Sequence, residues 1–298
     1  MWSDNVTVCL MVYNEEKRVE YALRNFHGKF KILVVDDLPA STDKTREICE
    51  RYGVEYMTVA KRGHLEQPCV MGPVWDRIKT DYMIYAMCAE YLPDELLRLY
   101  AQVANDKSYD IVCANRISIC AGKHLYVWGR NKMRWIPRIG PGRFSRRGSI
   151  NYEGNPIHRY GKVTCDKRRI LPVSDDPKLM YYQFMDYDAQ ASEAKCHYYN
   201  NTIARHMHEA GERYSFWKMI YKSIREFLIA YIIYGAWQDG HLGFMHSWYR
   251  FLIWMGIYLR MWDIEHNLQQ EQIAAIHCGM KNKLLAGEMK VESLLYLK

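Results

Sequence analysis

Short apolar runs alternate with amphipathic stretches over the first third of the chain. The runs cover residues 6–12, 32–35, 54–59 and 82–87, and each has the length and composition of a buried strand. Between them, residues 17–26 place Val19, Leu23 and Phe26 on one face of a helix, and residues 44–52 form a second helical pattern. Strands that alternate with helices predict a doubly wound, mostly parallel sheet.

Polar side chains follow the first two predicted strands at the point where each strand ends. Asn14, Glu15 and Glu16 come after the first strand, and Asp36 and Asp37 come directly after the second. The carboxyl ends of parallel strands meet at one edge of a sheet, where ligands of open α/β sheets bind. The Ser-Thr-Asp run at residues 41–43 predicts a helix whose first turn is capped by side-chain oxygens. Taken alone, the aspartate pair is better explained as a solvated strand end.

The last third of the chain shows two long helical patterns, at residues 214–237 and 244–262, joined by a glycine-rich turn. Lys218, Lys222 and Arg225 recur every three or four residues beside an apolar face rich in Phe, Tyr and Trp. This composition is typical of a helix that lies on an anionic membrane surface. A helical hairpin that packs on the preceding domain explains it at least as well. A further helix is predicted at residues 268–276.

Length and composition are those of a globular protein. The 298 residues, of which 49% are hydrophobic, suffice for one large domain or for a domain with a helical extension. The nine cysteines show no metal-type spacing, so we expect reduced thiols, no structural zinc and a cytoplasmic location. The N-terminus lacks the basic start and cleavage site of a signal peptide. The longest apolar run, residues 227–237, is shorter than the roughly 20 residues that span a bilayer.

The net charge of +7 is concentrated in one stretch of the chain. No acidic residue occurs between Asp110 and Glu153. The cations in that interval are Arg116, Lys123, Arg130, Lys132, Arg134, Arg138, Arg143, Arg146 and Arg147. Such a stretch predicts a polyanionic partner, which is a nucleotide diphosphate, an anionic lipid or glycan, or a nucleic acid backbone. For any single arginine, a solvated basic surface is the better explanation.

Four segments, in this order along the chain, together resemble a known enzyme family. They read VTVCLMVYNEE from residue 6, ILVVDD with STDKT from residue 32, DYMIYAMCAEYLPDELL from residue 81, and RFSRRGSINYEGNPIH from residue 143. The set is similar to the inverting family 2 glycosyltransferases of the GT-A fold, and most similar to the bacterial lipopolysaccharide-core type related to β-1,4-glucosyltransferases. The resemblance extends over about residues 5–262. It implies a GT-A domain at residues 1–200, followed by a helical extension at residues 201–298.

The function implied by this resemblance is glycosyl transfer, with inversion, from a nucleotide-sugar donor to an acceptor hydroxyl. The enzyme would be of the hexosyltransferase type, with a UDP-sugar as the expected donor. Glu15, Asp36 and Asp37 would accept hydrogen bonds from the base and the ribose hydroxyls of the donor. The residues expected to lie along the nucleotide are Val12, Tyr13 and Asn14.

The metal motif of the family is degenerate in this chain. The resemblance places an Asp-x-Asp, often followed by Glu, at the end of the fourth strand, where it holds Mg²⁺ or Mn²⁺ against the donor diphosphate. Met87, Cys88 and Ala89 occupy these positions, and only Glu90 is kept. A thiol and a thioether are poor ligands for a hard cation.

Three interpretations of this loss stay open. Guanidinium groups bind phosphate in a bidentate manner, so Arg143, Arg146 and Arg147 would neutralise the diphosphate without a metal. Alternatively, Glu90 holds the metal together with His158. In the third interpretation, the protein has lost transferase activity.

The catalytic base is a second departure from the family. The family usually shows His followed by Glu, whereas here His158 is followed by Arg159. An inverting transfer needs a group that takes the proton of the attacking hydroxyl. Asp175 and Asp176 are near in sequence but cannot be placed. The catalytic candidates are therefore Glu90, Glu153 and His158.

The acceptor implied by the resemblance is a glycan or glycolipid, which would bring the protein to the cytoplasmic face of the inner membrane as a peripheral protein. Aromatic residues are interleaved with the cations between residues 123 and 147, and this composition suits stacking on sugar rings and on bases alike. Two alternatives stay open. One is a glycosyltransferase that acts on a modified base in DNA, and the other is a non-catalytic protein that binds a polyanion on the same fold.

Overall fold

The computed structural model describes residues 2–60, 65–125, 143–155, 161–174, 176–185, 189–268 and 270–296. Three groups of sequence-based candidates lie outside the described residues: His158, Asp175 and the basic residues between 126 and 142. The chain divides into two compact units. The first unit consists of Met1–Asp188 and Tyr231–Phe244, and the second of Ala189–Ala230 and Met245–Lys298. The domain boundary predicted near residue 200 stays a prediction.

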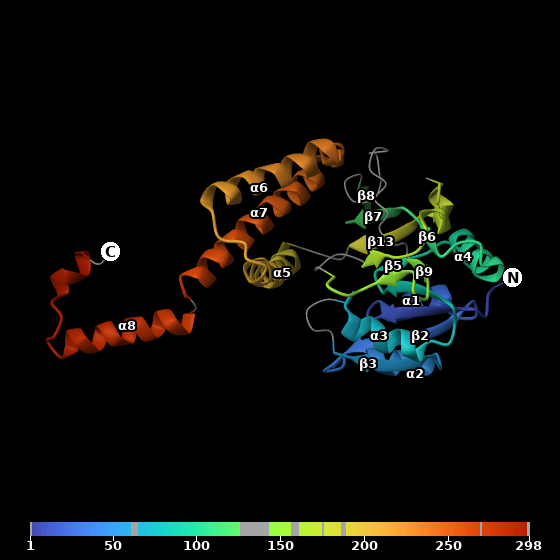
Figure 1. The fold of residues 1–298 in the computed structure, drawn as a ribbon, viewed down its shortest axis with the longest axis horizontal. Coiled ribbons are helices and arrows are strands. Elements are labelled where there is room, and N and C mark those ends of the chain that lie inside the picture. The colour runs from blue at the N-terminus through green and yellow to red at the C-terminus, as the bar shows by residue number, and fades with distance from the viewer. Residues whose placement is uncertain are drawn as a thin grey trace. The chain divides into compact units, whose positions relative to one another are not determined.

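A seven-stranded sheet with the order β12-β6-β9-β4-β1-β2-β3 is the centre of the first unit (Figure 1). Its strands are β1 Val6–Met11, β2 Lys31–Asp37, β3 Glu55–Val59, β4 Tyr82–Met87, β6 Ile111–Cys113, β9 Phe144–Arg146 and β12 Ile170–Pro172. Neighbouring strands are parallel, except where β9 pairs with β4 and with β6. This mostly parallel sheet confirms the predicted fold class, and β1 to β4 are the four apolar runs of the sequence.

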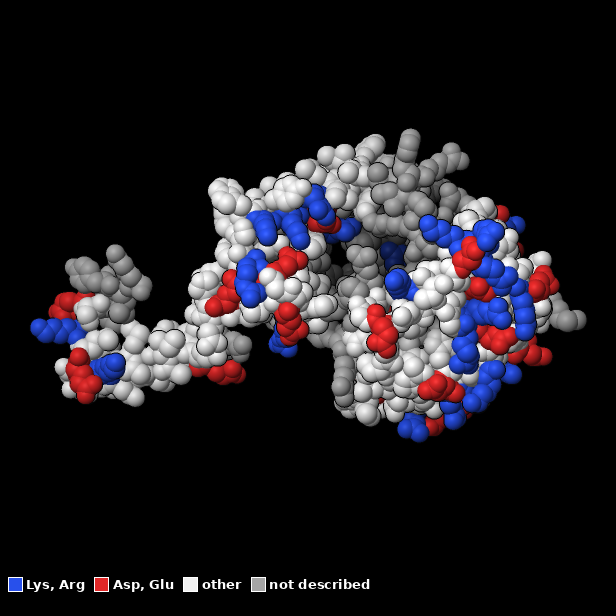
Figure 2. Space-filling view, viewed as in Figure 1, with Lys and Arg blue, Asp and Glu red and all other residues white. Residues whose placement is uncertain are grey.

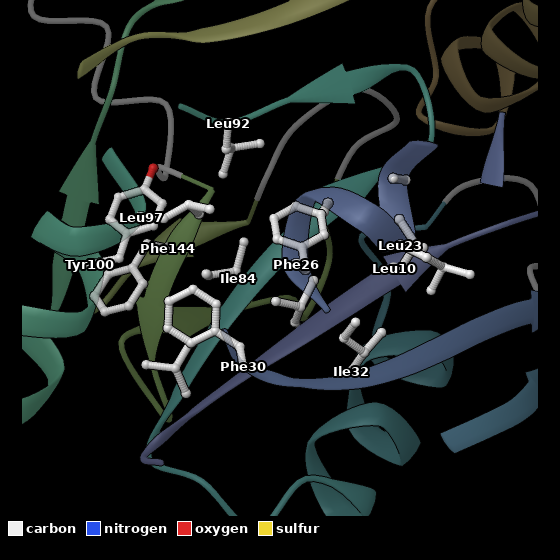
Figure 3. Close-up of a cluster of buried hydrophobic side chains, with 14 of the residues drawn as sticks. Leu10, Leu23, Phe26, Phe30, Ile32, Ile84, Leu92, Leu97, Tyr100 and Phe144 are labelled. Atoms are coloured by element: carbon white, nitrogen blue, oxygen red, sulfur yellow. The ribbon is translucent and has the colours of Figure 1, made fainter. Parts of the chain in front are cut away.

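Alternating side chains build a core on each face of this sheet. Leu10 of β1 and Ile84 of β4 belong to the first core (Figure 3), whereas Cys9 and Met11 of β1 belong to the second. The first core includes side chains of α1 (Val19–Phe26), α2 (Thr45–Arg51) and α4 (Asp94–Asp106), and the second includes those of α3 (Pro68–Arg77). Every residue of β1 is buried, as expected for a parallel strand that is covered on both faces.

A smaller four-stranded sheet with the order β5-β13-β7-β8 was not predicted. Its strands are β5 Glu90–Tyr91, β13 Tyr181–Met185, β7 Arg116–Cys120 and β8 Lys123–Leu125. Two short strands, β10 Ile150–Asn151 and β11 Lys162–Val163, form an antiparallel pair, and 3-10 turns cover Lys167–Arg169 and Pro177–Leu179. Because β5 follows β4 after two residues, the chain leaves the carboxyl edge of the large sheet and joins the small sheet at Glu90.

The second unit consists mainly of long helices. The segment Tyr231–Phe244, which belongs to the first unit, lies between its two parts in the sequence. The long helices are α5 Ala189–Glu209, α6 Phe216–Leu228, α7 Gly240–Glu265 and α8 Gln270–Leu285, with a π-helix at Ile229–Ile233 and 3-10 turns at Ala236–Asp239 and Val291–Tyr296. Ala204, Met219 and Tyr258 bring α5, α6 and α7 together in one apolar core. The helical pattern predicted over residues 214–237 is interrupted, because Gly235 adopts a left-handed φ of 78°. No helix within the described ranges is long and apolar enough to cross a membrane.

Candidate functional site

The loops that follow β1 and β2 are hydrogen-bonded to each other at the carboxyl edge of the large sheet. The backbone N–H groups of Asn14 and Glu15 donate to the hydroxyls of Ser41 (2.9 Å) and Thr45 (2.7 Å), respectively. In return, the backbone N–H of Thr42 donates to the side-chain oxygen of Asn14 (2.9 Å). Because each loop satisfies polar groups of the other, their shape is set by the protein and requires no ligand.

Side chains that the sequence predicted as helix caps mainly accept backbone N–H groups of the loop after β1. Helix α2 begins at Thr45, and the residue before it, Lys44, makes no side-chain capping bond. One carboxylate oxygen of Asp43 accepts the N–H of Thr45 (3.0 Å), whereas the other accepts the N–H of Glu16 (3.0 Å). The capping prediction therefore holds for Asp43 alone. The Ser41 hydroxyl is engaged outside the helix, where it receives the N–H of the other loop.

Asp36 is fully buried, and the protein satisfies its carboxylate completely. One oxygen accepts the N–H of Asp37 (2.7 Å) and the hydroxyl of Ser41 (2.9 Å). The other oxygen accepts the N–H of Ser41 (2.7 Å) and the hydroxyl of Tyr56. Burial and the hydrogen bond to Asp36 raise the pKa of Tyr56, so the phenol stays a donor. We therefore revise the prediction that Asp36 contacts a nucleotide, because its four acceptor positions are already used to shape the loop.

Other predicted residues of this edge remain accessible to solvent. The side chain of Tyr13 is 49% exposed, and Asp37 is half-buried, with one carboxylate oxygen accepting the N–H of Leu38 (2.8 Å). The carboxylate of Glu15 binds the guanidinium of Arg18 through both oxygens (2.7 and 2.8 Å). The predicted residues that the structure brings together here are Val12, Tyr13, Asn14, Glu15, Asp36 and Asp37.

The carboxyl end of β4 holds a buried ion pair. The carboxylate of Glu90 binds the guanidinium of Arg143, and their side chains are 0% and 3% exposed. Glu90 also accepts the N–H of Met87 (3.1 Å). The guanidinium carbon of Arg143 lies 5.2 Å from the ring centre of Tyr85 and 5.4 Å from that of Tyr181, within cation–π range. Burial raises the pKa of Glu90, and the charge of Arg143 opposes this effect.

These residues do not fit the divalent metal that the family resemblance implies. The carboxylate of Glu90 is occupied by Arg143. Burial raises the pKa of the Cys88 thiol, so this sulfur stays neutral, and Met87 offers only a thioether. Neither sulfur suits a hard cation such as Mg²⁺ or Mn²⁺. Within the described part of the chain, no group of three His, Cys, Asp or Glu side chains is placed to hold a metal ion.

The three arginines considered for the diphosphate do not lie together. Arg143 lies near the carboxyl end of β4, where its carbonyl accepts an N–H of that strand (2.7 Å). Arg146 is paired in register with Tyr82, the first residue of β4, and its guanidinium binds Asp110 (3.3 Å). Arg147 donates to backbone carbonyls at the end of α3. Since β4 and β1 are parallel, Arg146 lies at the opposite edge of the sheet from the two loops, and we withdraw its role at the diphosphate.

Glu153 lies on the turn between β10 and β11, and its side chain is exposed. Two residues further on, the side-chain amide of Asn155 donates to the carbonyl of Glu66 (2.8 Å). The carboxylate of Glu66 in turn accepts the hydroxyl of Tyr85 on β4 (3.1 Å). These bonds tie the turn that carries Glu153 to the carboxyl-terminal half of β4. Sequence reasoning missed Glu66, because a single glutamate in a loop belongs to no recognisable pattern.

The chain is similar to several solved structures at low sequence identity. Among solved structures, S. aureus TarS is similar with a TM-score of 0.43 and 15% identity over 68% of this chain and 43% of that chain. The chain therefore spans less than half the length of that protein. TarS 1-349 in complex with UDP-GlcNAc gives a TM-score of 0.43 and 14% identity over 82% of this chain and 78% of that chain. A third structure is glucosyl-3-phosphoglycerate synthase from Mycobacterium tuberculosis in complex with Mn²⁺, UDP-glucose and phosphoglyceric acid. It gives a TM-score of 0.30 and 16% identity over 40% of this chain and 45% of that chain.

A search of curated protein sequences gives no match. The family model described as glycosyl transferase family 2 matches residues 7–160, just over half of the chain. This range contains β2 to β4, all of β1 except its first residue, both hydrogen-bonded loops and the buried ion pair of Glu90 with Arg143. The chain belongs to glycosyl transferase family 2.

Proposed function

We propose that the protein transfers a sugar from a UDP-sugar donor to an acceptor hydroxyl, with inversion at the anomeric carbon. The observation that carries this proposal is the pair of loops after β1 and β2, which are hydrogen-bonded to each other within the range that the family model matches. Loops that already hold their shape lose little conformational entropy when a ligand binds. We assign nucleotide recognition to Tyr13 and Asp37, and a supporting role to Asp36 and Glu15.

The chemistry needs a group that accepts the proton of the attacking hydroxyl. The acceptor oxygen forms a bond to the anomeric carbon while the bond from that carbon to the diphosphate oxygen breaks on the opposite face. We propose that the exposed carboxylate of Glu153 accepts this proton. Hydrogen bonds of Asn155 and Glu66 connect the turn that carries Glu153 to β4. Glu90 is not used in this proposal, because its carboxylate is buried against Arg143. No metal held at the end of β4 is required.

We propose a glycan or glycolipid of the lipopolysaccharide-core kind as the acceptor, at the cytoplasmic face of a membrane. The support for this choice is the resemblance of the four sequence segments to that group of glucosyltransferases. A DNA acceptor and a non-catalytic role in binding polyanions are the competing outcomes of the experiments that follow.

Thermal stability measured with a panel of UDP-, GDP-, TDP- and CDP-sugars tests the donor assignment. A specific ligand at about 100 times its Kd should stabilise the protein by roughly 2.7 kcal/mol. We expect one nucleotide class, UDP, to give this response. Asp37→Ala should remove it, and Asp106→Ala, at an exposed carboxylate in the last turn of α4, should keep it. No response to any nucleotide sugar would leave the polyanion-binding role as the better account.

The rate of sugar transfer tests the assignment of Glu153 as the general base. We expect Glu153→Gln to lower the rate of transfer by roughly 10²–10⁴, the usual contribution of a general base, while UDP-sugar binding is unchanged. Glu95→Gln, at an exposed position of α4, is the matched control. Equal turnover in the two variants would remove Glu153 from the mechanism. Transfer to hydroxymethylated DNA, but to no glycan, would identify the acceptor as a modified base in DNA.

A further inference from the structure

Helix α6 carries large apolar side chains on the side that faces away from its packing partners. The packed side consists of Met219, Ser223 and Glu226, all buried. Each residue of a helix is rotated by about 100° from the one before it, so positions two apart lie on nearly opposite sides. The opposite side of α6 consists of Trp217, Tyr221, Ile224 and Leu228, which are 78%, 63%, 46% and 43% exposed.

Helix α7 repeats this arrangement. Its packed side includes Ser247, Ile257, Tyr258 and Met261, which are buried. The large apolar side chains of α7 that are exposed within the second unit are Met245, Trp248, Leu252, Leu259 and Trp262. Their spacing of three, four or seven residues places them along one side of the helix. We call the exposed apolar residues of α6 and α7 named in these two paragraphs the outer apolar surface.

Contacts within the second unit hold α6 and α7 together, so the outer apolar surface belongs to one packed helix pair. Glu226 of α6 binds Arg250 of α7 (3.1 Å), and the ring of Phe227 meets that of Trp248 edge to face, with 6.2 Å between centroids. The ammonium of Lys222 lies 4.9 Å from the ring centre of Trp254. Trp248 makes one of these contacts and is still 41% exposed, so the packed helix pair leaves part of its apolar surface accessible to solvent.

Cations border the outer apolar surface along one side of α6. Lys218, Lys222 and Arg225 are spaced by four and three residues, about 100° around the helix from Trp217, Tyr221 and their neighbours. Figure 2 shows lysine and arginine side chains gathered over the region of α6. Phe216–Leu228 contains a single acidic residue, Glu226, which is buried and bound to Arg225 (2.7 Å) as well as to α7. The exposed part of α6 thus combines aromatic residues with positive charge.

This combination fits the surface of an anionic bilayer. Trp and Tyr side chains prefer the level of the lipid headgroups, where a ring is buried and its polar atom stays hydrated, and nearby cations are attracted to anionic lipid. A second copy of the chain fits less well. A two-fold symmetric interface would bury this patch against the same patch of the second copy, cations included, and this helix offers no exposed carboxylate to pair with them.

We propose that the outer apolar surface and the cations beside it dock the protein on anionic phospholipid membranes. The aromatic and aliphatic side chains of α6 and α7 enter the headgroup layer, and Lys218 and Arg225 contact lipid phosphates. This docking does not depend on the glycosyl transfer proposed above, and it is compatible with an acceptor that is carried by the membrane.

Flotation of the full-length protein with vesicles tests the proposal. We use phosphatidylcholine vesicles with and without roughly one third phosphatidylglycerol, over a salt series. We expect binding to the anionic vesicles that weakens as salt rises. Trp217→Ser/Ile224→Ser should reduce the affinity by about tenfold or more, because two exposed anchors are lost. Tyr21→Ser, at a residue of α1 that is 70% exposed, is the matched control and should bind as the wild type does.

Charge reversal tests the contribution of the cations separately. Lys218→Glu/Arg225→Glu should remove the preference for anionic vesicles, whereas Lys79→Glu/Lys167→Glu, at exposed positions of the first unit, should keep it. Circular dichroism and thermal melting check that each variant is folded, and quenching of Trp fluorescence by brominated lipid reports contact directly. Absence of wild-type binding, or equal binding by the outer-surface variants, would overturn the proposal. So would a dimer in solution that Trp217→Ser/Ile224→Ser dissociates, without any binding to vesicles.

Discussion

Two buried carboxylates, which lie near the carboxyl ends of β2 and β4 at the same edge of the large sheet, have different kinds of hydrogen-bond partner. After β2, Asp36 is satisfied by four hydrogen bonds from loop residues and Tyr56, and the adjoining side chains of Asp37 and Tyr13 stay accessible. After β4, Glu90 is satisfied by the guanidinium of Arg143, and the chain enters the small sheet at once. The first arrangement leaves side chains accessible to solvent beside the buried carboxylate. The second fills the position where the family resemblance implies a metal ion.

The largest effect should come from breaking the ion pair after β4. Arg143→Met leaves the carboxylate of Glu90 buried without its cation, which should lower the free energy of unfolding by about 3–5 kcal/mol. Urea denaturation monitored by fluorescence measures this loss. Glu90→Gln/Arg143→Met should recover much of it, because the uncompensated charge is gone. If the double variant is as unstable as Arg143→Met, the pair is not the feature that stabilises this strand end.

A smaller effect should come from the loop after β2. Asp36→Asn replaces one acceptor oxygen by an amide donor that faces other donors, which should cost about 2–3 kcal/mol of unfolding free energy. Asp37→Asn should change stability by only about 0.5 kcal/mol, as is usual for accessible positions, yet weaken UDP-sugar binding. Denaturation and calorimetric titration of both variants check the contrast. Similar stability losses in the two variants would remove the distinction between a supporting and a binding aspartate.

Replacement of Asp110 tests the claim that Arg146 forms its ion pair at the far edge of the sheet and not at the donor site. Hydrogen bonds from Arg169 and then Arg146 lower the pKa of Asp110 against the opposing effect of burial. A lowered pKa in the folded state gives stability that is present above the unfolded-state pKa near 4 and is lost as pH falls towards the folded-state value. Asp110→Asn should therefore cost about 1–3 kcal/mol at pH 7 and progressively less below about pH 4.

Denaturation over a pH series measures this dependence, and UDP-sugar affinity measured on the same variant at pH 7 should be unchanged. A marked loss of affinity in Asp110→Asn would return Arg146 to the donor site.

The smallest effect is expected from metal ions. Since Glu90 is bound by Arg143 and neither Met87 nor Cys88 suits a hard cation, Mn²⁺ or EDTA should change UDP-sugar affinity by less than about twofold. Calorimetric titration with and without each reagent checks this. A tenfold gain with Mn²⁺ would show that residues outside the described ranges complete a metal site, and the contrast between the two strand ends would then be wrong.

The elements that the sequence predicted well are those with continuous apolar runs. Strand β4 matches its predicted bounds, because all six of its residues are apolar or aromatic and face the cores. Strands of the small sheet, such as β7 with Arg116 and Ser118, were missed because they are short and carry polar residues. Their pairing with β13, far along the chain, decides their conformation, and no local pattern records it.

The candidate site was predictable in its location but less so in the role of each residue. The polar residues after β1 and β2 meet at one edge, as the parallel pairing of the strands requires. The role of Asp36 depends on the hydroxyl of Tyr56, a residue of another strand, and that of Glu90 depends on Arg143. Such partners are distant in sequence, so the aspartate and the glutamate could not be distinguished from accessible carboxylates before the fold was known.

Hydrogen–deuterium exchange, measured with and without UDP-sugar, locates the donor site directly. The account predicts that the ligand slows exchange in peptides that cover residues 12–16 and 36–45, where backbone N–H groups of the two loops lie. It predicts no slowing in β9 or in α6. Protection confined to segments other than the two loops, with residues 12–16 and 36–45 unchanged at saturating ligand, would contradict the claim that the nucleotide-sugar binds at the carboxyl ends of β1 and β2.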